Sequence, residues 1–195
     1  GNPLWGGTIL KVVDADKDGD IDVLVGNGDT LDSPRAATFQ GLHILKNEGG
    51  LQFKHQQLAA LPGLQDVEIL DYDSDGDLDF VLAASVTPTV LKMLESAVPA
   101  GRVIGSLLLL ERQKNGDYKA VTLTDRPPCY SALASTPSGD LLIGNFGLGW
   151  EILGQKQSVS ANQRALSDCS NEAPLKVWSF NAPEAQSAPD ELSKL

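Results

Sequence analysis

Two acidic nonapeptides with identical spacing constrain this chain more than any other feature of its sequence. Each reads Asp-x-Asp-x-Asp-Gly-Asp-x-Asp, the first over residues 14–22 and the second over residues 71–79. Five carboxylates within nine residues repel one another and raise each other's pKa, so the fold must separate or neutralise them. The pattern therefore predicts two tight loops of the same structure that need the same kind of counter-charge.

The two clusters also explain the charge of the chain. The 195 residues include 15 Lys and Arg against 26 Asp and Glu, which gives a net charge of -11, and ten of these acids lie in the clusters. A surplus of negative charge repels phosphate backbones and anionic lipids. The sequence also has no apolar run near the roughly 20 residues of a membrane helix. We therefore expect neither nucleic-acid binding nor membrane insertion.

The clusters belong to an internal repeat. Asp71 follows Asp14 by 57 residues, and both loops are flanked by short apolar stretches. Farther along, Gly41–Asn47 parallels Gly105–Glu111 in a second copy of the same pattern. A fixed period with one supersecondary unit per copy is the signature of a repeat array or a propeller.

A third copy has lost the acidic loop. Asp140-Leu-Leu-Ile-Gly-Asn145 resembles Asp22-Val-Leu-Val-Gly-Asn27, and residues 174–181 resemble Gly41–Asn47. The segment Ser135-Thr-Pro-Ser-Gly139 stands where the acids would be. We therefore expect this copy to lack the function of the two acidic loops, whatever ion or group they bind.

Short β-rich segments bounded by Gly, Asn and Asp predict four strands per repeat. In the first copy they are Val12–Val13, Val23–Val25, Leu42–Leu45 and Leu51–Lys54. The fold class is therefore all-β, with four-stranded antiparallel sheets, and a short helix is expected only at Leu91–Ala97. The expected divisions are a first blade over residues 1–60, a second over 61–125, a degenerate third over 126–181 and a flexible tail over 182–195.

The acidic loops have the composition of a calcium site. Every candidate ligand is a hard oxygen, which favours Ca²⁺ over Zn²⁺ or Cu²⁺. Alternate spacing turns positions 1, 3 and 5 inward, the Gly at position 6 permits the sharp turn, position 7 offers its backbone carbonyl and position 9 its carboxylate. The expected ligands of two calcium ions are Asp14, Asp16, Asp18, the Asp20 carbonyl and Asp22, and Asp71, Asp73, Asp75, the Asp77 carbonyl and Asp79.

An EF-hand shares the Asp-x-Asp-x-Asp-Gly pattern but does not fit. It requires a bidentate Glu at position 12 and flanking helices. Position 12 is Val25 in the first loop and Leu82 in the second, and both flanks are rich in β-formers. The remaining alternative to a strand–loop–strand calcium site is a solvated acidic turn that binds no ion.

Residues 13–26 and 70–82 resemble the calcium-binding loops of FG-GAP/VCBS repeats, as found in integrin α-like β-propellers, and residues 45–53 resemble the end of a blade in that family. The resemblance implies that each repeat is a propeller blade whose acidic loop binds Ca²⁺ between its first two strands. Propellers have about four to eight blades. This chain supplies about three, so we expect part of a larger or composite β-propeller, completed by other protein chains or by the rest of a longer chain.

These features favour a calcium-binding, non-enzymatic binding or interaction module with a structural calcium. Such loops suit millimolar extracellular Ca²⁺, so we expect an extracellular, cell-surface or periplasmic location. Carbohydrate is a further candidate ligand, because three Trp residues could stack on sugars, although packing in the core or between blades is the favoured alternative; they are Trp5, Trp150 and Trp178. A disulfide between Cys129 and Cys169 would suit an oxidising compartment, and two free thiols are the alternative.

No familiar catalytic motif occurs in the sequence, and no catalytic residue is proposed. Two other functions stay open. One is part of a calcium-dependent propeller enzyme, a lyase or hydrolase acting on polysaccharide, for which the long loops offer few candidate groups, among them Arg35, Lys92 and Arg102. The other is a structural subunit of a larger multi-chain assembly. The first residues, Gly1-Asn2-Pro3, suggest a mature product, an excised domain or a fragment.

Overall fold

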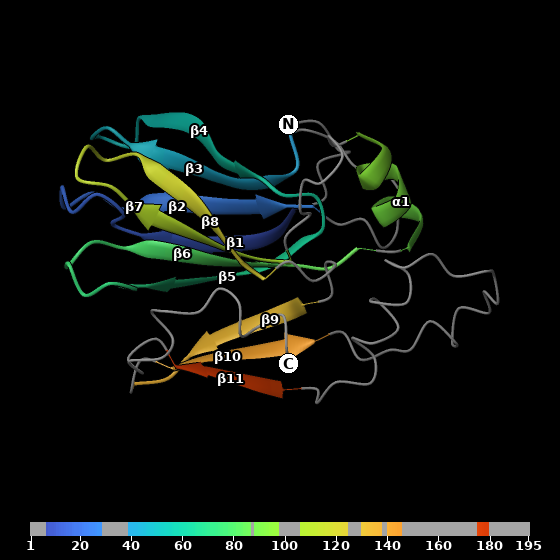
Figure 1. Cartoon of the computed structure of the whole chain (residues 1–195). Helices are drawn as coiled ribbons and strands as arrows, with labels where there is room; N and C mark the ends of the chain where they lie inside the picture. The colour runs from blue at the N-terminus through green and yellow to red at the C-terminus, as the bar shows by residue number, and fades with distance from the viewer. Residues whose placement is uncertain are drawn as a thin grey trace.

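The computed structural model describes residues 7–28, 39–86, 88–97, 106–124, 130–137, 140–145 and 175–179. The described residues form three antiparallel sheets and one helix (Figure 1). The first sheet contains, in order, β1 (Gly7–Val13), β2 (Asp22–Asn27), β3 (Gly41–Asn47) and β4 (Phe53–Ala60). The second contains β5 (Leu64–Leu70), β6 (Asp79–Ala84), β7 (Leu107–Arg112) and β8 (Tyr118–Thr124). The third contains β9 (Tyr130–Ser135), β10 (Asp140–Asn145) and β11 (Leu175–Ser179), with β10 in the middle.

The all-β class and the four-stranded antiparallel sheets are confirmed, whereas the described residues do not form a closed propeller. The helix α1 (Pro88–Ala97) lies between β6 and β7 and begins three residues before the expected start. Proline at the first helical position explains the earlier start, because its φ suits a helix and its missing N–H would have no helical partner there. Among the described residues, no helix is long and apolar enough to span a membrane.

The fourth strand of the first sheet was expected at Leu51–Lys54; the strand is present, but it shares only Phe53 and Lys54 with that range. Leu51 has a φ of 60° and lies in a turn closed by a hydrogen bond from Glu48 N to Gln52 O. The strand therefore begins at Phe53 and continues to Ala60. Its side chains are mostly exposed, so the apolar alternation that reveals a strand in a sequence is weak here.

The alignment of the third strands also needs a correction of one residue. Val23 of β2 pairs with Leu45 of β3, and the corresponding Phe80 of β6 pairs with Leu110 of β7. Leu45 therefore corresponds to Leu110, an offset of 65 rather than the 64 that aligning Gly41 with Gly105 implies. The difference matters because a shift of one residue moves every side chain of a strand to the other face of the sheet.

The three sheets are stacked in chain order with an apolar core in each interface (Figure 1). The core between the first and second sheets includes Ile9, Leu24, Leu42, Ile44, Leu64, Val67, Phe80, Leu82 and Leu110. The core between the second and third includes Val81, Ala83, Leu107, Leu109, Leu133, Leu141 and Ile143, together with Val90 and Leu91 of α1. The second sheet is therefore buried on both faces, and β6 is buried at every residue.

Both acidic loops lie at one end of this stack. The β1–β2 and β5–β6 connections project at the same end, and α1 lies at the opposite end (Figure 1). The stacking therefore brings the two loops next to each other, although they are far apart in sequence.

Candidate metal centre

The two acidic loops share positive φ values at the same two positions. Lys17 and Ser74, at position 4 of their loops, have φ values of 63° and 60°. Gly19 and Gly76, at position 6, both have a φ of 93°. A φ near 90° is strained for a residue with a Cβ, which explains the Gly at this position in each loop.

Carboxylates inside each loop accept hydrogen bonds from its backbone. Asp14 accepts from the N–H groups of Asp18 and Gly19, at 3.2 and 3.0 Å, and Asp71 accepts from Gly76 N at 3.0 Å. Asp18 and Asp75, at position 5 of their loops, each accept from the backbone N–H two residues farther on. Asp18 Oδ1 accepts from Asp20 N at 2.9 Å, and Asp75 Oδ1 accepts from Asp77 N at 2.8 Å. These bonds curl each loop around its own carboxylates.

The last Asp of each loop attaches the loop to the sheet. Asp22 is 1% exposed; its Oδ2 accepts from Ala15 N at 3.0 Å and its Oδ1 from Asn47 N, on β3, at 2.8 Å. Asp79, also 1% exposed, accepts from Tyr72 N at 2.9 Å and from Arg112 N, on β7, at 2.7 Å. The sequence did not reveal this role, because the two backbone donors on the third strands are distant in the chain.

Three carboxylates converge in each loop. Oxygens of Asp14, Asp16 and Asp18 lie within 4.8 Å of one another in the first, as do oxygens of Asp71, Asp73 and Asp79 in the second. The other four expected ligands, Asp20, Asp22, Asp75 and Asp77, lie in the same loops but outside these groups. Together the two groups use positions 1, 3, 5 and 9 of the pattern.

Asp16 has the most distinctive surroundings in the first loop. One of its carboxylate oxygens forms an ion pair with Lys46 Nζ, on β3, while its Oδ1 is buried without a hydrogen-bond partner. Burial acts to raise the pKa of Asp16, but the hydrogen bond and charge of Lys46 outweigh it, so that pKa lies below its ordinary value. The same hydrogen bond raises the pKa of Lys46.

The second loop lacks an equivalent of this lysine. The position that corresponds to Lys46 is Glu111 on β7, whose carboxylate faces Lys119 Nζ at 3.8 Å. Burial raises the pKa of Asp79; the backbone N–H bonds oppose this rise, and the negative charges of Asp73 and Asp75 add to it. The second loop therefore has a carboxylate, rather than an ammonium, at the position of β7 that corresponds to Lys46.

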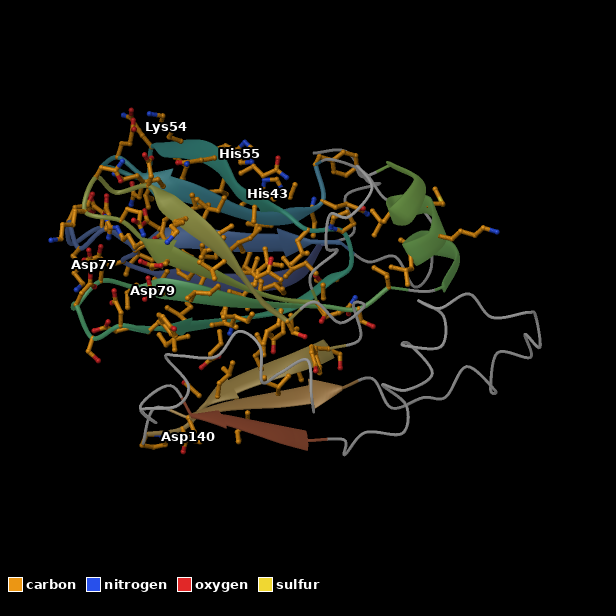
Figure 2. All side chains as sticks on the ribbon, viewed as in Figure 1. His43, Lys54, His55, Asp77, Asp79 and Asp140 are labelled. Carbon is orange, nitrogen blue, oxygen red and sulfur yellow. The ribbon has the colours of Figure 1, made fainter. Side chains whose placement is uncertain are left out.

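Contacts between the sheets join the two loops. Lys17 Nζ of the first loop lies 3.9 Å from Asp77 Oδ1 of the second, at the loop end of the stack where Figure 2 labels Asp77. The Arg112 guanidinium, on β7, donates to the Ala15 carbonyl at 2.6 Å. Sequence reasoning missed Lys17, Lys46 and Arg112. Strand pairing within the first sheet places Lys46 beside Asp16, and sheet stacking places Lys17 beside Asp77 and Arg112 beside the Ala15 carbonyl.

This donor set fits a calcium ion. The converging groups are all carboxylates, which are hard oxygen ligands, and the acidic nonapeptides contain neither Cys nor His. Calcium accepts six to eight oxygen ligands in flexible geometry, which carboxylates, backbone carbonyls and water can supply together. The buried Asp16 Oδ1 has lone pairs with no protein hydrogen bond to satisfy them, so a cation at this position would compensate it.

The third sheet has a different connection between its first two strands. Thr136 N donates to the Asp140 carbonyl at 2.8 Å, and Asp140 N donates to Thr136 Oγ1 at 3.0 Å, which closes a short turn. No acidic residue lies between Ser135 and Asp140 in the sequence. Figure 2 shows Asp140 on the third sheet, away from Asp77 and Asp79.

Several other expectations fall outside the described residues. These are the Cys129–Cys169 pairing, Trp5, Trp150, Arg35, Arg102 and the tail over 182–195. Lys92 is exposed on α1, and Trp178 lies in β11, where its backbone pairs with Leu141. The comparisons with known proteins add no neighbour: no family model, no curated protein and no solved structure matches this chain.

Proposed function

We propose that this chain is a calcium-binding, non-enzymatic interaction module in which two calcium ions have a structural role. The observation that carries the proposal is the pair of acidic loops with the same spacing, each with three carboxylate oxygens within 4.8 Å of one another. The loops also share their φ values at positions 4 and 6 and the hydrogen bond from the Gly N–H to the first Asp. The unpartnered Asp16 Oδ1 supports a cation in the first loop.

The structural role follows from where the loops are attached. Each loop connects the first two strands of a sheet, and its last Asp is bonded to the third strand. A cation that neutralises the remaining carboxylates would stabilise this junction of three strands. Because a ligand that binds only the native state stabilises it by RT ln(1 + [L]/Kd), calcium at a hundredfold excess over Kd contributes about 2.7 kcal/mol per site.

We also propose that the chain is an FG-GAP/VCBS-type repeat protein and acts outside the cytoplasm. Two four-stranded antiparallel sheets with the acidic loop between the first two strands support the repeat type. Sites of this kind suit the millimolar calcium found outside cells. The described residues form three sheets, fewer than the four to eight blades of a propeller, so the partner proposed is a further protein chain, or more of this one, that completes the array.

Calcium stoichiometry tests the proposal. Isothermal titration of the metal-free chain with Ca²⁺ should give two equivalents, and Asp73→Ala should give one. Asp140→Ala is the matched control, because it removes an Asp at the start of the second strand of a sheet without an acidic loop, and it should leave two. Absence of calcium binding in the unsubstituted chain, or one equivalent lost in the control, would refute the assignment.

A further inference from the structure

On the first sheet, one face is exposed along β1 and partly exposed along β2, although His43 of β3 on the same face is buried. In the other two sheets, most of the positions that correspond to this face of β1 and β2 are buried. Leu10 and Val12 on β1 are 73% and 64% exposed. Strand register shows that Leu10 corresponds to Val67 in the second sheet and to Leu133 in the third. Val67 and Leu133 are 0% and 8% exposed, because each packs on the sheet that precedes it in the chain.

The neighbouring strand repeats this relationship. Val23 and Val25 of β2 are partly exposed, and they share the face of Leu10 and Val12. Their counterparts in β6 are Phe80 and Leu82, and their counterparts in β10 are Leu141 and Ile143, all of them buried. We call the face formed by Leu10, Val12, Val23 and Val25 the leading face.

The opposite end of the stack carries the complementary face. The first and second sheets bury Leu24 and Val81 against the sheet that follows. Their counterpart in the third sheet is Leu142, which is partly exposed, and it is flanked on β9 by the exposed Ala132 and Ala134. We call the face formed by Ala132, Ala134 and Leu142 the trailing face.

We infer that a second copy of this chain docks head to tail, with the trailing face of one copy on the leading face of the other. The contact continues the two interfaces already present in the stack, because it joins the same faces in the same order. The position of Ala134 in β9 corresponds to Lys11 in β1 and to Glu68 in β5. Because Ala134 is uncharged, it brings no charge to the exposed Leu10 and Val12 of the second copy. Two copies would bring six sheets, within the four to eight of a closed propeller.

This inference deepens the proposed function, from which it takes only the expectation of a further chain. Because head-to-tail contacts join two different faces, a ring of two copies has two equivalent contacts. The unsubstituted chain in calcium should therefore have twice the mass of one chain in light scattering. Leu10→Asp and Ala134→Asp should each give the mass of one chain that still melts cooperatively, because both side chains are exposed within a single copy.

Mixing the two variants tests the direction of docking. A Leu10→Asp copy retains an intact trailing face and an Ala134→Asp copy an intact leading face, so the mixture should recover a two-chain species through one contact. Lys114→Asp, which changes an exposed lysine between β7 and β8, is the matched control and should stay dimeric. A chain that stays monomeric at every concentration overturns the inference, as does a dimer that Leu10→Asp disrupts and Ala134→Asp leaves intact. Both variants retain the acidic loops. Each should therefore still bind two equivalents of calcium, so a failure of docking can be distinguished from a failure of the proposed calcium sites.

Discussion

The Arg112 guanidinium donates to the Ala15 carbonyl at 2.6 Å, which ties the third strand of the second sheet to the acidic loop of the first. The backbone N–H of the same Arg112 donates to Asp79, the last Asp of the second loop. One residue thus contacts both candidate calcium loops. This arrangement makes the geometry of each loop dependent on the packing of the two sheets.

Arg112→Met should weaken this connection. It retains the backbone bond to Asp79 but removes the bond to the Ala15 carbonyl, which should lower the free energy of unfolding by roughly 1–2 kcal/mol. Urea unfolding of the metal-free chain measures the change. Lys114→Met, an exposed lysine two residues away, should be close to neutral, and an equal loss in both variants would show that the Ala15 contact contributes nothing.

Asp22→Ala should destabilise the chain even without calcium. It leaves the N–H groups of Ala15 and Asn47 without their buried acceptor, at a cost of about 1–3 kcal/mol for each donor. Asp16→Ala, in contrast, should change stability little in a chelator and should abolish the stabilisation by calcium at the first loop. Thermal melting of both variants with calcium and with EDTA distinguishes the structural role of Asp22 from the calcium-binding role of Asp16. Equal losses of stability in EDTA would contradict this assignment of roles.

Lys46→Met should increase calcium affinity at the first loop. Lys46 pairs with Asp16, so the ammonium competes with a cation for the same carboxylate. Removing a partly exposed pair should cost the metal-free chain about 0.2–1 kcal/mol. Calcium titration should then show tighter binding at one site only, with the second site as the internal reference. Weaker binding at the first loop would mean that Lys46 organises the site rather than competes for it.

Acid should destabilise the first sheet through His43. Its Nε2 lies 2.8 Å from the Phe39 carbonyl and its Nδ1 lies 3.0 Å from His55 Nε2. A carbonyl only accepts, so Nε2 carries the proton, and Nδ1 of the neutral ring accepts from His55. Burial lowers the pKa of His43 below its ordinary 6.5, while the bond to Phe39 opposes the change and the charge of His55 adds to it.

The lowered pKa fixes the sign of this effect. The unfolded chain binds the His43 proton at higher pH than the folded chain, so this stability is complete above about pH 6.5 and is lost as the pH falls through the folded-state pKa. The corresponding residue in the second sheet is Leu108. His43→Leu, which introduces the same residue in the first sheet, should reduce the slope of melting temperature against pH below 6.5. His55→Gln keeps the buried ring and should retain most of the slope. An unchanged slope in His43→Leu would contradict the prediction.

The sequence by itself determined the repeat, the all-β class and the nature of the candidate ligand atoms. These features are local: the acids lie within nine residues of one another, and apolar alternation and breakers mark most strands without knowledge of their neighbours. The same locality explains the failure at the fourth strand, where Phe53–Ala60 is mostly exposed and lacks that alternation.

Only the tertiary structure decided which groups surround the acids. Lys46 reaches Asp16 across the first sheet, Lys17 reaches Asp77 between sheets, and the acceptors of Arg112 are 97 and 33 residues away in sequence. The exposure of Leu10 and the burial of the corresponding Val67 are likewise set by stacking alone. Two residues at corresponding positions differ in exposed fraction because burial depends on which surface packs against them. Strand pairing and sheet packing bring together residues that are distant in sequence, so the local pattern does not reveal these contacts.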